Sequence, residues 1–443
     1  MLFKRKIYDD LLKWKNEDGG RTVALIEGAR RVGKTTVVTE FAKKEYRSCL
    51  IINFSEVSED VLEIFRKRSN LDSFFMQLQL RFDVVLYEGE SLIVFDEIQF
   101  FPLARQMLKQ LVADGRYHYI ETGSLISVYK NVKNILIPSE EHPIPMYPMD
   151  FEEWLWANGN ESTVHNLRQF FESRESVGMH VHKALLERFM TYLIVGGMPQ
   201  VVDTYLRTNN MAKVDEKKNE VLDLYRSDMV KLPERQYEYA RALFDGIPTL
   251  LSSRKKTFSP GKIMKGSRSR SFSGSITWLD DAKMILPCYS CNDPNVTVNL
   301  TCDKSLSKLY FVDTGLLISL AFGKGNPHIN DVYMDLIRGK LSINQGMFFE
   351  NMVAQQLVAK GYKLMFHRFE SDGNEYEVDF IIPGRRGIIP LEVKSSSSTR
   401  HRSLDLFKDK YRSRIDRTYV IHGKDLRVDG DVVYIPIYMT MFL

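Results

Sequence analysis

The segment "GARRVGKTT", residues 28 to 36, constrains the fold more than any other feature of this sequence. It satisfies the pattern G-x-x-x-x-G-K-[ST] in full. The fixed positions are Gly28, Gly33, Lys34 and Thr35. An apolar run, Val23 to Ile26, precedes it and an amphipathic stretch follows it, which predicts a buried strand, a glycine-bounded loop and a helix. Such an arrangement surrounds a phosphate with backbone N–H groups and the positive end of a helix.

We therefore expect a P-loop that binds ATP together with Mg²⁺. Lys34 would reach the β- and γ-phosphates, and the Thr35 hydroxyl would ligate the metal. An ordinary glycine turn without a ligand is the alternative interpretation. The predicted nucleotide-binding residues of the loop are Gly28, Ala29, Arg30, Arg31, Val32, Gly33, Lys34, Thr35 and Thr36.

An acidic pair follows the next strong strand signal, "SLIVFDEIQFFP". The unbroken apolar run from Leu92 to Phe95 is typical of a central parallel strand with both faces covered. Asp96 and Glu97 come at its carboxyl end, where open α/β sheets place their chemistry. We expect Asp96 to complete the Mg²⁺ site with Thr35, and Glu97 to polarise the attacking water. A solvent-facing acid pair is the alternative.

A third strand is predicted in "RYHYIETGSLIS" and ends at Thr122, Gly123 and Ser124. A polar residue at this point can sense the γ-phosphate, and a simple strand-to-turn signal fits the sequence equally well. Thr122 and Ser124 are therefore candidate sensor residues of the nucleotide site.

In this order and spacing, the motifs "GARRVGKTT", "FDEIQ", "ETGS" and "YPMDFEEW" resemble AAA-superfamily ATPases of prokaryotes. More narrowly, they resemble the subgroup whose C-terminus carries a domain of unknown function. The resemblance covers nearly the whole chain and implies a P-loop fold, nucleotide hydrolysis and a sensor near Thr122 and Ser124. The family usually has a Gly-Arg pair before the last motif, but residues 125 to 147 contain no Arg. We therefore expect hydrolysis that is slow or needs a partner.

Four domains are predicted along this α/β multidomain chain. A P-loop parallel-sheet ATPase domain, 1–150, is followed by a helical domain, 151–235, with helical periodicity and a break at Gly196-Gly197. A winged-helix-like module, 236–320, and a restriction-endonuclease-like α/β domain, 321–443, complete the chain. The module is inferred from a helix, turn, helix and strand pattern, and the resembled family carries something similar here.

The most basic stretch of the chain lies in that module. It has no acidic residue between its first and last cation, and its cations are Arg254, Lys255, Lys256, Lys262, Lys265, Arg268 and Arg270. One interpretation is contact with phosphates along DNA, with an affinity that falls as salt rises. The other is a solvated basic loop on a winged-helix scaffold. Nearby, Cys288, Cys291 and Cys302 lack a fourth ligand for zinc, so we expect them to fill a β-sheet.

The C-terminal segment has the order helix, three strands, helix, strand, which is the core order of the PD-(D/E)xK nuclease fold. Glu350 lies on the predicted helix Gly346–Lys360, Asp379 on the middle strand, and Glu392 and Lys394 on the next strand. Residues two apart on a strand point to the same face, and "PGRRG" is a hairpin signal.

These residues suggest a second Mg²⁺ site on Asp379 and Glu392, with Glu350 beside it and Lys394 neutralising charge. Glu97, Glu350, Asp379, Glu392 and Lys394 are thus the candidate catalytic residues of the chain. The alternative is a catalytically silent scaffold, since fold similarity does not prove turnover.

The composition is compatible with these hypotheses. The 443 residues carry a formal net charge of +4, so global charge argues neither for nor against nucleic acid. Four cysteines and the absence of a signal or membrane segment favour a cytoplasmic protein without membrane association. We expect an ATPase with a nuclease-like domain that acts on, or is regulated by, nucleic acid. The alternative is an ATP-gated module that binds DNA or a protein partner without cutting.

Overall fold

The computed structural model describes residues 2–67, 70–123, 140–295, 298–340, 345–395 and 401–443. The chain divides into two compact units, Met1–Tyr147 and Pro148–Leu443. No helix within the described ranges is long and apolar enough to cross a membrane.

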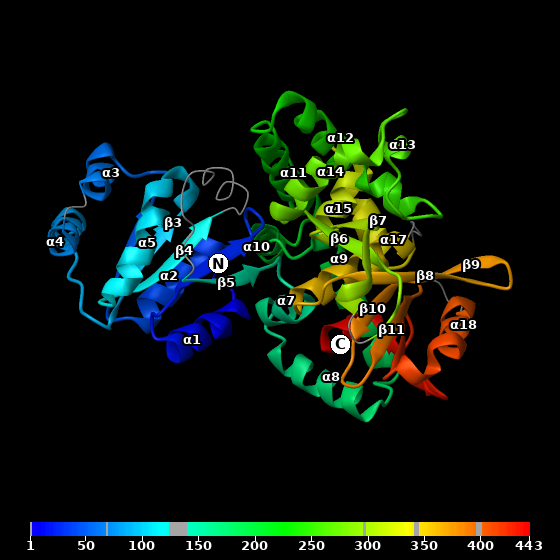
Figure 1. Ribbon diagram of the computed structural model, residues 1–443. Helices are drawn as coiled ribbons and strands as arrows, with labels where there is room; N and C mark the ends of the chain where they lie inside the picture. Colours follow the sequence, from blue (N-terminus) through cyan, green and yellow to red (C-terminus); the bar gives the residue numbers. More distant parts are fainter. Residues whose placement is uncertain (1, 68–69, 124–139, 296–297, 341–344, 396–400) are drawn as a thin grey trace. The chain divides into compact units, whose positions relative to one another are not determined.

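A five-stranded parallel sheet with the order β2-β3-β4-β1-β5 forms the centre of the first unit. Helix α1 packs with α2, while α3, α4 and α5 contribute to one apolar core with the sheet (Figure 1). The elements are α1 (Ile7–Asp18), β1 (Val23–Gly28), α2 (Lys34–Glu45), β2 (Ser48–Asn53), α3 (Glu59–Arg66), α4 (Leu71–Phe82), β3 (Ser91–Asp96), η1 (Ile98–Phe100), α5 (Pro102–Asp114), β4 (His118–Gly123) and β5 (Glu141–Met146).

The strand order places the predicted motifs at one edge of this sheet. Every residue of β3 is buried, as its unbroken apolar run predicts. Strand β4 lies between β1, which leads into the P-loop, and β3, which ends in Asp96. Because all strands are parallel, the three segments end at the same edge.

The second unit begins with helices. These are α7 (Phe151–Ala157), α8 (Glu161–Ser173), α9 (Met179–Val195), α10 (Pro199–Thr208), α11 (Met211–Met229), α12 (Glu234–Ser252), α13 (Pro260–Ile263) and α14 (Ser269–Asp281). The predicted break at Gly196-Gly197 is confirmed, since it separates α9 from α10. A β-carbon on Gly197 would lie 2.1 Å from the carbonyl oxygen of Met149, so only glycine fits at this corner.

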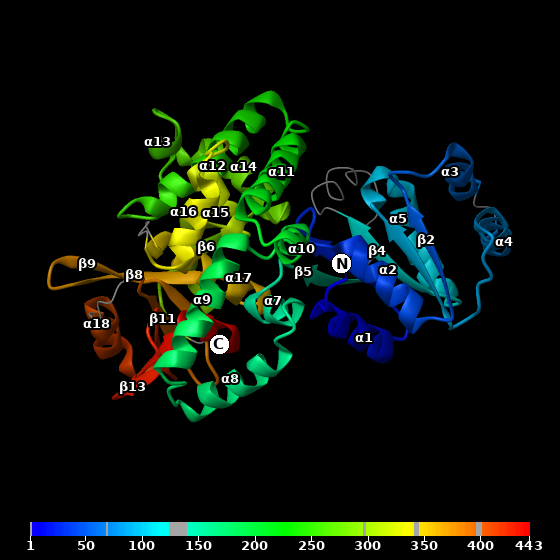
Figure 2. The same cartoon turned by 180° about the vertical axis from the view of Figure 1, so that it is seen from behind.

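Two sheets follow, β7-β6-β8-β9 and β10-β11-β12-β14-β13. The remaining elements are β6 (Ile285–Cys291), η2 (Val298–Thr301), β7 (Cys302–Phe311), α15 (Thr314–Phe322), α16 (Ile329–Ile337), α17 (Gln345–Ala359), β8 (Met365–Ser371), β9 (Asn374–Val378), β10 (Phe380–Pro383), β11 (Ile388–Val393), α18 (Arg402–Tyr411), η3 (Arg412–Arg414), β12 (Thr418–His422), β13 (Arg427–Asp429), β14 (Val432–Pro436) and η4 (Ile437–Phe442). The β8–β9 hairpin extends outward from the body of this unit (Figures 1 and 2).

The first of these sheets joins two of the predicted domains. Strand β6, in the predicted winged-helix-like module, pairs in parallel with β8 of the predicted nuclease-like domain. The predicted middle strand is divided at Asp379, because β9 belongs to one sheet and β10 to the other. The segments predicted as three domains therefore share one compact unit. Helices α12 to α14 and the β6–β7 hairpin have the order of a winged helix, which stays a prediction.

Candidate functional site

The P-loop connects β1 to α2 and depends on its two glycines. A β-carbon on Gly28 would lie 2.2 Å from the carbonyl oxygen of Met146. Gly33 precedes the helix with a φ of 99°, a conformation that side chains disfavour. Between them, Ala29 and Val32 are buried, whereas Arg30 and Arg31 are exposed. The apolar side chains of the loop are therefore buried in the unit, and its two arginine side chains face solvent.

Lys34 fills the position that a phosphate-binding lysine takes. Its Nζ donates hydrogen bonds to the carbonyl oxygens of Gly28, at 2.9 Å, and Ala29, at 3.1 Å. Burial lowers its pKa to about 8, against the opposing influence of Glu97 and Asp96. The Lys34 ammonium therefore donates its hydrogen bonds to carbonyl oxygens of its own loop. Phosphate oxygens would be stronger acceptors for the same N–H groups.

Thr35 and Asp96 meet, as their proposed shared role in binding Mg²⁺ requires. The Thr35 hydroxyl lies 3.0 and 3.1 Å from the two carboxylate oxygens of Asp96. From β4, the Thr122 hydroxyl also donates to Asp96, and Asp96 is only 2% exposed. Hydroxyl and carboxylate oxygens are ligands that Mg²⁺ prefers, so these residues fit the ion. Ser124, the other candidate sensor, lies outside the described residues.

Glu97 follows Asp96 and is held in place by a neighbour. Its backbone is left-handed, with φ 53° and ψ 43°, and the side-chain amide of Gln99 donates to its carboxylate. The sequence analysis did not single out Gln99. Its position in "FDEIQ", two residues after the predicted base, was the available signal.

Arg5 is a second residue that the sequence analysis missed. Its guanidinium donates to the carbonyl oxygens of Val32, at 2.9 Å, and Tyr147, at 2.7 Å, and the residue is 6% exposed. Nothing in the basic N-terminal sequence distinguishes Arg5 from Lys4 and Lys6.

Beside the loop, a surface groove of about 480 Å³ runs along α2, and its lining includes Thr35 and Thr36.

The four nuclease-like residues come together in the second unit. Glu350 lies on α17, Asp379 between β9 and β10, Glu392 on β11 and Lys394 just after β11. The Lys394 Nζ lies 2.6 Å from Glu392 Oε1, and the Val393 N–H donates to Asp379 Oδ2 at 2.9 Å. Antiparallel pairing of β10 with β11 confirms the predicted hairpin.

A lysine that the sequence analysis did not consider lies among these carboxylates. Lys308 of β7 is fully buried, and its Nζ lies 3.1 Å from Glu350, 2.7 Å from Glu377 and 3.8 Å from Asp379. Burial by itself lowers the pKa of Lys308, but the three carboxylates outweigh it and raise the pKa well above its usual range. The group is therefore a fixed positive charge.

The expected second Mg²⁺ does not fit these residues as they stand. Within the described ranges, no group of three or more His, Cys, Asp or Glu side chains is arranged to hold a metal ion. Both oxygens of Glu350 accept hydrogen bonds, from Lys308 and Tyr310 on one side and from Lys256 on the other. Burial and the nearby Asp379 raise the pKa of Glu392 to about 8.

The basic stretch is used in two ways. Lys256 pairs with Glu350, and Lys255 pairs with Glu375 of the β8–β9 hairpin at 2.9 Å. Lys265, Arg268 and Arg270 are exposed at and before the start of α14. Part of the stretch therefore serves the acidic cluster, and the rest faces solvent.

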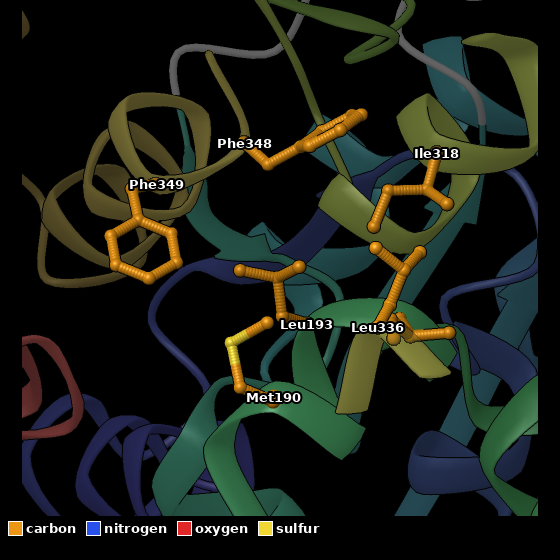
Figure 3. Close-up of a pocket in the computed structure, with 7 residues that line it drawn as sticks. Met190, Leu193, Ile318, Leu336, Phe348 and Phe349 are labelled. Atoms are coloured by element: carbon orange, nitrogen blue, oxygen red, sulfur yellow. The ribbon is translucent and has the colours of Figure 1, made fainter. Parts of the chain in front are cut away.

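Two further features do not form sites. Cys288 and Cys291 are buried in β6, and all four cysteines have free thiols. An apolar cavity lies among Met190, Leu193, Ile318, Leu336 and Phe348 and neighbouring side chains (Figure 3). Its interior has room of only about 10 Å³ for the centre of a water molecule, which is too small for an organic ligand.

Comparison with protein families gives three matches along the chain. Residues 20–155 match the family model "AAA domain". The first unit contains an AAA-type domain. Residues 186–326 and 345–440 match two separate domains of unknown function, DUF8612 and DUF4143. This match, together with the P-loop and its acid pair, supports an ATP-binding AAA protein.

Individual relatives are distant. An uncharacterized protein of Methanocaldococcus jannaschii is 25% identical over 44% of this chain and 43% of its own length. Among solved structures, a Walker-type ATPase of Pyrococcus abyssi has a TM-score of 0.44 and 16% identity, covering 72% of this chain and 96% of its own. The ORC2 protein of Aeropyrum pernix has a TM-score of 0.36 and 11% identity, covering 75% and 92%.

Proposed function

We propose that this protein binds and hydrolyses ATP with Mg²⁺ and acts on, or is regulated by, nucleic acid. One observation carries the first part. The Thr35 hydroxyl reaches the Asp96 carboxylate at 3.0 Å, at the end of a complete P-loop. A hydroxyl at the start of α2 and a buried acid at the end of β3, brought together beside a phosphate-binding loop, are what a magnesium–nucleotide complex requires.

The chain's own residues have distinct roles in this proposal. Backbone N–H groups from Gly28 to Thr35 hold the phosphates, and Lys34 exchanges its loop carbonyls for phosphate oxygens. Thr35 and Asp96 hold the Mg²⁺ ion, which when bound neutralises charge on the phosphates. Glu97 orients and polarises the attacking water. Thr122 fixes Asp96 through its hydroxyl.

Two substitutions test the ATPase proposal. In Lys34→Ala we expect loss of ATP binding, because the only side-chain cation buried in the loop is removed. In Glu97→Gln we expect ATP binding to remain and hydrolysis to fall by roughly 10²-fold or more, the usual scale for a catalytic base. Isothermal titration and a phosphate-release assay measure the two effects.

A matched control is Lys44→Ala, which removes an exposed lysine paired with Glu40 on the same helix. It should leave both binding and turnover unchanged. Unaltered turnover in both Lys34→Ala and Glu97→Gln would refute the assignment.

For the second unit we propose DNA binding without cleavage. Exposed Lys265, Arg268 and Arg270 support contact with phosphates, while Lys256 is occupied by Glu350. The described residues also offer no set of three metal ligands for cleavage. A protein partner in place of DNA is the competing outcome.

Charge reversal tests this second proposal. In Arg268→Glu/Arg270→Glu we expect DNA affinity to fall at least tenfold. The slope of log affinity against log salt concentration should also become shallower by the equivalent of about two phosphate contacts. Arg207→Glu/Lys213→Glu, on exposed positions of α10 and α11, is the control. The same DNA incubated with Mn²⁺ should stay intact. Salt-insensitive binding would favour a protein partner, and cleavage abolished by Asp379→Ala would favour a nuclease.

A further inference from the structure

The position of Lys308 suggests why the acidic cluster need not hold a metal. Its ammonium group lies between three carboxylates that come from α17, β9 and the bend that follows β9. We propose that Lys308 is a built-in cation: it occupies the space among Glu350, Glu377 and Asp379 for which a divalent metal ion would otherwise compete, and so keeps this carboxylate cluster free of metal.

The two cations would compete for the same carboxylates. Magnesium–oxygen distances are about 2.0–2.1 Å, so an ion bound to Glu350 and Asp379 would need the oxygens that lie 3.1 and 3.8 Å from the Lys308 Nζ. The ammonium has three donors and has three carboxylates within 3.8 Å. A fully buried lysine also has little room to withdraw. Two cations in one such space would repel strongly at low dielectric.

The other donors around the cluster reinforce this arrangement. Lys256 and Tyr310 occupy the remaining positions on Glu350, and the Val393 N–H occupies one oxygen of Asp379. Lys394 occupies Oε1 of Glu392. Of the described carboxylate oxygens of Glu350, Glu377, Asp379 and Glu392, only Oε2 of Glu392 is buried without a hydrogen-bond partner. This oxygen is where a metal would bind if the proposal were wrong.

The proposal predicts that removing Lys308 creates a metal site. In Lys308→Met, a substitution of similar length without charge, three carboxylates lose their shared cation. The melting temperature of the full chain should fall by roughly 10 °C, since breaking a buried ion pair is strongly destabilising. Mn²⁺ should raise the melting temperature of this variant again by several degrees. It should also bind to the variant at least tenfold more tightly than to the wild type. Adding Asp379→Asn should abolish both gains.

Lys218→Met is the matched control. Lys218 is also fully buried in the same unit, but it has one carboxylate partner, Asp215, at 3.8 Å. This variant should be destabilised and should gain no Mn²⁺ binding. The comparison separates the loss of a buried charge from the exposure of a metal site.

Thermal melts and Mn²⁺ titrations on nucleotide-free protein decide the question. Saturable Mn²⁺ binding by the wild type that Asp379→Asn removes would overturn the proposal. So would a folded Lys308→Met protein that gains no Mn²⁺ site. If Lys308→Met does not fold, the wild-type titration still decides, and Lys308→Arg, which keeps the charge, should fold and bind no Mn²⁺.

Discussion

Glu97 has a backbone conformation that residues with side chains seldom adopt, with φ 53° and ψ 43°. Such strain persists where the surroundings over-determine it, and it gathers at functional sites. Here the Gln99 amide donates to the Glu97 carboxylate, and the backbone N–H of Glu97 lies 3.5 Å from the Thr122 hydroxyl. At the scale of single residues, Gln99 is therefore a positioning residue for the proposed catalytic base, Glu97.

Gln99→Ala tests this role. The substitution frees the Glu97 carboxylate, so we expect kcat for ATP to fall by roughly tenfold, as for other residues that orient a catalytic group, while KM stays unchanged. Combined with Glu97→Gln, it should have almost no further effect, because both act through one group. A Gln99→Ala protein with raised kcat would instead mean that Gln99 holds Glu97 away from the nucleotide.

An element can be predicted from the sequence when the pattern that specifies it is contiguous in the chain. The P-loop, the "FDE" strand and the Gly196-Gly197 corner were predicted because each is a contiguous pattern with its own physical reason. The role of Lys308 was not predicted. A lysine in the strand "KSLSKLYF" resembles a solvent-facing residue, and only the fold of α17 and β9 around it brings in its carboxylate partners. A side chain whose partners come from distant segments has no recognisable pattern in the sequence around it.

Asp313 connects two such elements, because it caps the start of α15 and also bonds to the corner before α10. Its Oδ1 accepts from the Leu316 N–H of α15 at 2.9 Å, and its Oδ2 from the Gly197 N–H at 2.6 Å. In Asp313→Ala, both buried donors lose their acceptor, so we expect a loss of about 2–4 kcal/mol in the free energy of unfolding. Urea denaturation measures this loss.

The exposed cap Asn210, which accepts from two N–H groups at the start of α11, gives the comparison. Asn210→Ala should cost only about 1 kcal/mol. Equal losses in the two variants would contradict the connecting role of Asp313.

At the scale of the whole molecule, the chain divides into two compact units. The predicted boundary near residue 320 separates segments that share a sheet, since β6 pairs with β8. A single sequence carries no signal for the parallel pairing of strands more than 70 residues apart, because the residues of one strand do not identify the strand that pairs with it. The second unit is therefore expected to unfold cooperatively as one body.

Acid should destabilise this second unit partly through His422. Burial, and then the positive charges of Arg427 and Lys424 and the nearby His182, lower its pKa to about 4, against about 6.5 in an unfolded chain. The unfolded state therefore binds the proton first as pH falls. Stability from this group is fully present above about pH 6.5 and is lost as pH falls toward 4, by on the order of 3 kcal/mol.

Denaturation curves between pH 7 and 4 measure this effect. His422→Gln should flatten the pH dependence of stability, whereas His165→Gln, at an exposed position, should not. An unchanged pH slope in His422→Gln would show that other groups govern the acid response.

Arg5 has a practical consequence for work with this protein. Its guanidinium fastens the first residues of the chain to Val32 in the P-loop. A tag or an insertion placed next to Arg5 would disturb this contact with the phosphate-binding loop. We therefore expect nucleotide affinities measured with and without such a change to differ, although the loop's own sequence stays the same.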